Sequence, residues 1–107
     1  MRRRVYDIAH ARAGDKGNSI NIAVIARKDS GYYELLEYLT PEIVFKTFSH
    51  LADGPVERYE LPNILSFNFL INNLKGGSVT NTLAMDTHGK SLSYLMLSIE
   101  LPSNLSV

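Results

Sequence analysis

The sequence predicts an α+β fold, a two-layer sandwich in which helices cover one face of a small mixed or antiparallel sheet of about four strands. Apolar residues recur at every second position in some segments and at every third or fourth position in others. These segments follow one another as strand, strand, helix, helix, strand, helix, strand and helix. The 107 residues contain no linker, repeat or compositional break, so we expect a single domain over residues 1–107.

The first half of the chain predicts two strands separated by a polar loop. Residues 3–9 are a strand candidate, and residues 10–19 form a polar stretch with two glycines, three charged residues and His10. The run over residues 20–26 is apolar on both alternating faces except at Asn21. This pattern is typical of a central strand that is covered on both sides.

Two helices are expected next. One begins at Asp29 or Ser30, and the other restarts at Thr40-Pro41-Glu42 and ends at Gly54-Pro55. A hydroxyl at the N-cap, a proline in the first position and an acid in the first turn all suit the free amides of a helix start. The apolar stripes that would face the sheet are Tyr32, Leu35, Leu36 and Leu39, and then Val44, Phe48 and Leu51.

The second half predicts a strand, a helix, a strand and a helix. Residues 56–61 alternate as a strand with one wetter side, and residues 62–75 carry apolar side chains at near-helical spacing. A strand over 79–85 and a turn over 86–89 follow. Residues 92–99 fit helical spacing, although alternation through residue 101 leaves a strand open; we favour a helix for the first half.

The loop over residues 10–19 is the strongest candidate for a site. Its glycines allow backbone amides to point inward around an anion, and its charged side chains could bind or protonate a ligand. The alternative is a solvated turn whose Asp and Asn satisfy their own backbone. The candidate ligand residues in and beside this loop are His10, Arg12, Gly14, Asp15, Lys16, Gly17, Asn18 and Asn21.

Asn21 is included because a polar side chain in an apolar strand needs a hydrogen-bond partner, and the loop is the nearest one. Arg58 could clamp a carboxylate or phosphate, or pair with Glu57 or Glu60. Gly76 and Gly77 could cradle a phosphate if the two glycine loops converge, although a helix C-cap and turn is the simpler interpretation. No catalytic residue can be named from these patterns.

The sequence predicts neither a cofactor nor a metal. It contains no cysteine, and its three histidines have no ligand spacing. Balanced charges, with eleven Lys/Arg and eleven Asp/Glu, exclude the broad positive field of a non-specific nucleic-acid binder. No apolar run is long enough to cross a bilayer, and the basic start lacks a signal-peptide core. We therefore expect a cytoplasmic protein with neither a nucleic-acid nor a membrane partner.

Several motifs give the chain a family resemblance. The stretch 8–18 with Asn21-Ile22 resembles the opening of the AtuA-like ferredoxin-fold domain, the C-terminal part of acyclic terpene utilisation proteins. The likeness runs from about residue 5 to 101 and continues through 39–42, 54–62, Asn68-Phe69, Gly76-Gly77 and 86–90. The resemblance implies a ferredoxin-like sandwich and a link to the breakdown of branched acyclic acids as coenzyme A thioesters. It supplies no established catalytic residues.

The resemblance also implies partners. The family domain is often fused behind a larger N-terminal domain, so a stand-alone copy would act as an auxiliary subunit on a separately encoded large subunit, or form a homo-oligomer. The leading hypothesis gives this subunit a small anionic ligand at loop 10–19. One alternative is a structural oligomerisation module, and another is a stand-alone enzyme that uses His10, Asp15 and Lys16 as acid, base and oxyanion partner. Whether the chain is an enzyme stays open.

Overall fold

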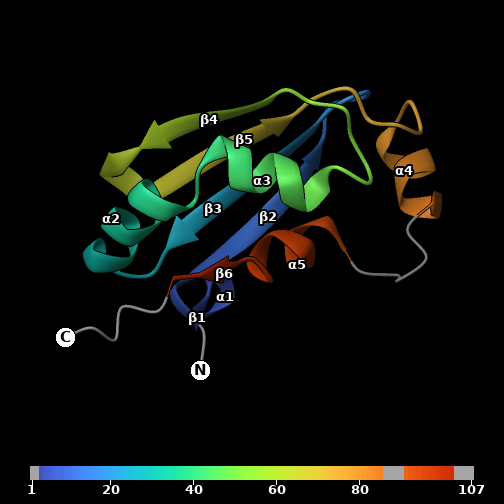
Figure 1. Cartoon of the computed structure of the whole chain (residues 1–107). Coiled ribbons are helices and arrows are strands. Elements are labelled where there is room, and N and C mark those ends of the chain that lie inside the picture. Colours follow the sequence, from blue (N-terminus) through green and yellow to red (C-terminus); the bar gives the residue numbers. More distant parts are fainter. Residues whose placement is uncertain (1–2, 86–90, 103–107) are drawn as a thin grey trace.

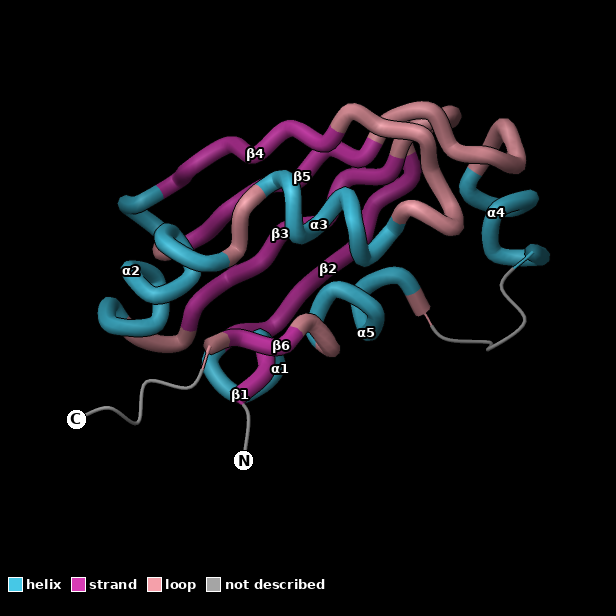
Figure 2. The backbone as a smooth tube through the Cα atoms, viewed as in Figure 1, coloured by secondary structure: helices cyan, strands magenta, loops and turns pink. Residues whose placement is uncertain are grey.

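The computed structural model describes residues 3–85 and 91–102, and it contains one layer of strands and one of helices (Figure 1). Figure 2 separates the strands from the helices along the same path. The elements in chain order are β1 (Arg3–Arg4), α1 (Val5–Ile8), β2 (Ala9–Asp15), β3 (Ile20–Ala26), α2 (Asp29–Tyr38), α3 (Pro41–Phe48), β4 (Val56–Leu61), η1 (Pro62–Ile64), β5 (Ser66–Ile71), α4 (Val79–Met85), α5 (Leu92–Leu97) and β6 (Glu100–Leu101).

The main sheet has four strands in the order β2-β3-β5-β4, and every neighbouring pair is antiparallel. Strands β3 and β4 therefore run parallel with β5 between them, and α2 and α3 connect them, which is the split β-α-β unit of a ferredoxin-like fold. The chain runs ββαββα, however, where that fold usually runs βαββαβ. Strand β2 takes the place of the usual last strand. The expected α+β, ferredoxin-like class is confirmed.

Helices α2, α3 and α5 lie on the same face of the sheet (Figure 1). Ile20, Ile22 and Val24 of β3 point to that face and are buried, as are their register partners on β5. Tyr32 of α2 closes the layer, because its ring stacks on Phe67 with 4.7 Å between the centroids. Burying each side chain of this size contributes about 1.5–3 kcal/mol to folding, so this interface is the core.

The other face of the sheet, which we call the open face, has no helix of residues 3–85 or 91–102 over it (Figure 1). Strand β3 is therefore covered on one side only, contrary to the sequence-based expectation, and its odd-numbered residues are half-buried. The register assigns twelve positions to the open face: His10, Arg12, Gly14, Asn21, Ala23, Ile25, Glu57, Tyr59, Leu61, Ser66, Asn68 and Leu70.

The expected strand over residues 3–9 is mostly wrong. Only Arg3–Arg4 form a strand there, paired with β6, and a four-residue helix follows. The Arg4 amide donates to Asp7 Oδ2 at 2.8 Å, which caps this helix, and Val5 on it is fully buried. The central sheet consequently begins at Ala9.

The expected helix over 62–75 and strand over 79–85 are exchanged in the structure. Pro62–Ile64 make a single 3-10 turn, Leu65 adopts a left-handed conformation with φ of 54°, and residues 66–71 form a central strand. Residues 79–85 form a helix that starts where Ser78 Oγ accepts from the Asn81 amide at 3.3 Å. The helix favoured for the start of 92–99 is confirmed. The expected turn over 86–89 lies outside the described residues.

Candidate functional site

The predicted loop over residues 10–19 is mostly a strand. Residues 10–15 belong to β2 and pair with β3 as far as Asp15 opposite Ile20, which leaves only residues 16–19 as the turn. Ala9, Ala11 and Ala13 alternate toward the helix side and face Ala26, Val24 and Ile22. Alanine is too small and too weakly apolar to make this period of two visible in the sequence.

The turn uses its own amides. The Gly17 amide donates to Asp15 Oδ1 at 2.7 Å, and the Lys16 amide donates to the Ser19 carbonyl at 3.0 Å. Gly17 has φ of 72°, which a glycine adopts without strain. Because both donors are satisfied within the turn, the solvated-turn alternative describes this geometry, rather than a ring of amides open to an anion.

The second glycine pair lies at the same end of the sheet. The Leu74 amide donates to the Asn18 carbonyl at 3.0 Å, and Gly76 and Gly77 follow one residue later. A Cβ on Gly76 would lie 2.8 Å from the Asn81 backbone, so this glycine lets α4 pack closely. Gly77 has φ of 81° and donates its amide to the Leu74 carbonyl. Close packing at Gly76 and the positive φ at Gly77 therefore account for glycine at both positions without a ligand.

A hollow of about 280 Å³ adjoins the turn on the helix side, but it is not cationic. Asp15 is the one charged residue in its described lining, and Arg12 and Lys16 are not part of it. Its other lining residues are Ala13, Gly14, Ile20, Val79, Ser91, Leu92 and Ser93. The candidate residues thus divide between two faces, with Asp15 on the helix side and His10, Arg12 and Asn21 on the open face.

Asn21 finds its partner across the sheet rather than in the loop. Its Nδ2 donates to Asn68 Oδ1 on the neighbouring strand β5. Its Oδ1 lies 2.7 Å from the position that a Cβ on Gly14 would take. Gly14 therefore provides the space that the Asn21 amide needs, which is a structural reason for a glycine in the middle of a strand.

The open face carries one unpaired charge on each edge strand. Arg12 of β2 is exposed and has no ionic or hydrogen-bond partner within the described residues. Glu57 of β4 accepts from the Tyr59 hydroxyl at 2.5 Å and from Asn72 Nδ2 at 3.1 Å, but no described cation contacts it. The hydrogen bond to Glu57, followed by its negative charge, raises the pKa of Tyr59.

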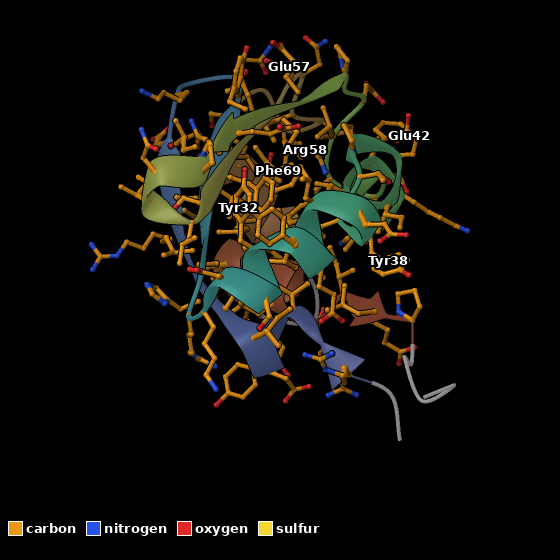
Figure 3. All side chains as sticks on the ribbon, turned by 90° about the vertical axis from the view of Figure 1, so that its left-hand side faces the viewer. Tyr32, Tyr38, Glu42, Glu57, Arg58 and Phe69 are labelled. Carbon is orange, nitrogen blue, oxygen red and sulfur yellow. The ribbon has the colours of Figure 1, made fainter. Side chains whose placement is uncertain are left out.

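Arg58 belongs to the opposite face. Its NH1 donates to the Leu36 and Leu39 carbonyls at 3.0 and 2.9 Å, and its NH2 pairs with Glu60 at 3.0 Å. Figure 3 shows Arg58 on the helix side near Phe69, while Glu57 lies at the outer edge. Its side chain is only 14% exposed, so it closes the C-terminus of α2 and is not positioned to join Arg12.

The residues that sequence reasoning missed are Asn68, Glu57 and Tyr59. The alternation over residues 56–61 places Tyr59 and Leu61 on one face of their strand, and the same period adds Glu57. It does not show that this face is the one that carries Arg12. Within residues 3–85 and 91–102, no group of three or more His, Asp or Glu residues could hold a metal ion. No helix in these ranges is long and apolar enough to cross a membrane.

Comparison with known proteins gives one match. The family model described as the AtuA ferredoxin-like domain matches residues 3–102, nearly the whole chain. No curated protein and no solved structure matches.

Proposed function

Because the chain belongs to the AtuA ferredoxin-like domain family, we propose that it is an auxiliary subunit of an enzyme that breaks down acyclic carboxylic acids or their coenzyme A thioesters. The domain contributes a binding surface, and a separately encoded large subunit supplies the reacting groups. The observation that carries this proposal is the separation of the residues that could have acted as acid and base.

His10 and Asp15 lie on opposite faces of β2, because their register partners Ile25 and Ile20 lie on opposite faces of β3. Five residues of extended strand separate them by about 16 Å. Asp15 also holds the Gly17 amide, and Lys16 lies in the turn. A general acid and base must both come within hydrogen-bond reach of the reacting group, so this arrangement does not support a stand-alone enzyme built on these residues.

The test is reconstitution. We expect no turnover of branched acyl-CoA by the purified chain, and turnover when the large subunit is added. His10→Ala and Asp15→Asn should keep kcat within about threefold, whereas loss of a general acid or base lowers it about 100-fold or more. Turnover by the chain alone, or a 100-fold loss in either variant with an unchanged circular dichroism spectrum, would contradict the auxiliary role.

A second candidate function is recognition of a small carboxylate by Arg12, since this exposed guanidinium has no anionic partner among residues 3–85 and 91–102. Calorimetric titration with 3-methylbutanoate should give a binding isotherm that Arg12→Gln abolishes. Lys46→Gln, which removes one exposed positive charge from α3, is the matched control and should bind normally. An isotherm that is unchanged in the Arg12 variant would rule out this site.

A further inference from the structure

We propose that the open face is the surface on which two copies of this chain pack together, with Arg12 of each copy meeting Glu57 of the other. The inference deepens the auxiliary role, because it names a partner for a domain that works by binding. It differs from recognition of a small carboxylate by Arg12, the second candidate function, in the source of the anion. A small ligand accounts for Arg12 alone, whereas a second copy accounts for both unpaired charges.

Exposed apolar side chains mark this face as a contact surface. Tyr59 and Leu61 of β4 are 49% and 43% exposed on this face. Ile25 and Leu70 on the central strands are half-buried, and no layer from the described part of the chain covers them. Exposed apolar residues gathered on one surface are typical of protein interaction sites, and the opposite face of the same sheet is already used by the core.

The charge layout is self-complementary. The cation lies on one edge strand and the anion on the other, with amide and apolar residues between them. The register orders the open face into rows across β2, β3, β5 and β4: His10, Ile25, Ser66 and Leu61; then Arg12, Ala23, Asn68 and Tyr59; then Gly14, Asn21, Leu70 and Glu57.

A two-fold axis can pair both charges at once if it lies midway between the two packed sheets. It runs parallel to the strands, in line with the gap between β3 and β5. This operation places β2 of one copy over β4 of the other without shifting the rows, as an isologous interface requires. Arg12 then lies over Tyr59 of the second copy, one row, or about 7 Å, from Glu57. Packed sheets lie about 10 Å apart, so a long arginine side chain can span this offset. Symmetry repeats the contact.

Pairing through the sheet edge is less favourable than pairing through the face. The edge strand β4 carries Glu57, Arg58 and Glu60 within six residues, and charges on an edge oppose the addition of another strand. Four strands of about six residues present roughly 20 by 20 Å before side-chain relief is counted. With that relief, the face approaches the lower range of specific interfaces, about 600 Å² per partner.

The experiment is a charge-reversal cycle read by sedimentation velocity at about 1–100 μM protein. This range brackets the micromolar dissociation constant that is typical of an interface of this size. Wild-type chain should sediment as a dimer. Arg12→Glu and Glu57→Arg should each weaken dimerisation at least tenfold, and the double variant should recover it. Lys46→Glu, a charge reversal on the helix side, should leave the dimer intact. A monomeric wild type, or a double variant that fails to recover while both single variants remain folded, would overturn the proposal.

A second measurement does not depend on tolerance of the charge reversals. The described chain has no cysteine, so Ala23→Cys introduces a single thiol beside the proposed axis. A short bis-maleimide should join two such chains, and Ser49→Cys at the end of α3 should remain unjoined. Absence of a cross-link at Ala23 would contradict the face-to-face arrangement. Failure to activate a large subunit would overturn the proposed function and leave both of these results unaffected.

Discussion

Replacement of Arg58 tests whether a largely buried cation, rather than helix propensity, holds the end of α2. Arg58→Met retains most of the apolar stem over Phe67, which the guanidinium faces at 5.3 Å from the ring centroid. It removes the donors to the Leu36 and Leu39 carbonyls. The Leu36 carbonyl lies in the last turn of α2 and the Leu39 carbonyl at its C-cap, where the helix itself offers no donor.

The size of the effect follows from these contacts. A hydrogen bond that involves a charged group contributes about 1.5–3 kcal/mol, and the favourable position at a helix C-terminus adds about 0.3–1 kcal/mol. Partial access of water to the site reduces the sum, because the side chain is 14% exposed. We expect the free energy of unfolding to fall by about 2–3 kcal/mol, a large part of the 5–15 kcal/mol typical of a domain.

Urea unfolding followed by circular dichroism measures this loss as a lower midpoint with an unchanged m-value. Glu60→Gln is the matched control, because it removes the ion pair alone. Glu60 is 48% exposed, so its loss should cost less than about 0.5 kcal/mol. If Arg58→Met is as stable as wild type, or if Glu60→Gln is equally destabilising, the helix-closing role of Arg58 is wrong.

Three further predictions concern other parts of the fold. Gly14→Ala should cost about 1–2 kcal/mol in urea unfolding, because its Cβ would displace the Asn21 amide, and the cost should largely disappear in an Asn21→Ala background. Glu57→Gln should lower the raised pKa of Tyr59 toward its ordinary value of 10.0, as measured by carbon NMR of the ring. Since the pKa of Tyr59 is raised in the folded state, the contact with Glu57 stabilises the fold at pH values below 10.0. This stabilisation is lost as the pH rises through the pKa of the folded state. Thr40→Ala should cost about 1 kcal/mol in thermal melts by removing the N-cap of α3, and Thr40→Ser should restore it.

The parts of the fold that could be predicted from the sequence are those with one clear period or a specific cap. The run of β3 and the Thr40-Pro41 start of α3 are of this kind. Residues 62–75 were mispredicted because Phe67 and Ile71 fit a helical spacing as well as an alternation with Phe69. The left-handed Leu65 and the position of β5 between two strands decide in favour of the strand.

The candidate site could be predicted only in part for a related reason. Arg12 and Asn21 stand out by residue type within their segments. Their neighbours on the open face, Asn68 and Tyr59, come from strands more than 30 residues away. Only the strand order brings Arg12, Asn68 and Tyr59 into one row, with Asn21 in the next, and no local pattern encodes that order.

The pairing of β1 with β6 places Arg3 opposite Leu101, so the two ends of the described chain lie side by side. Joining these two ends and opening the backbone at the turn over residues 16–19 would make β3 the first strand and β2 the last. The element order would then become βαββαβ, with every contact of the sheet retained. This domain and the usual ferredoxin-like topology are therefore related by a circular permutation.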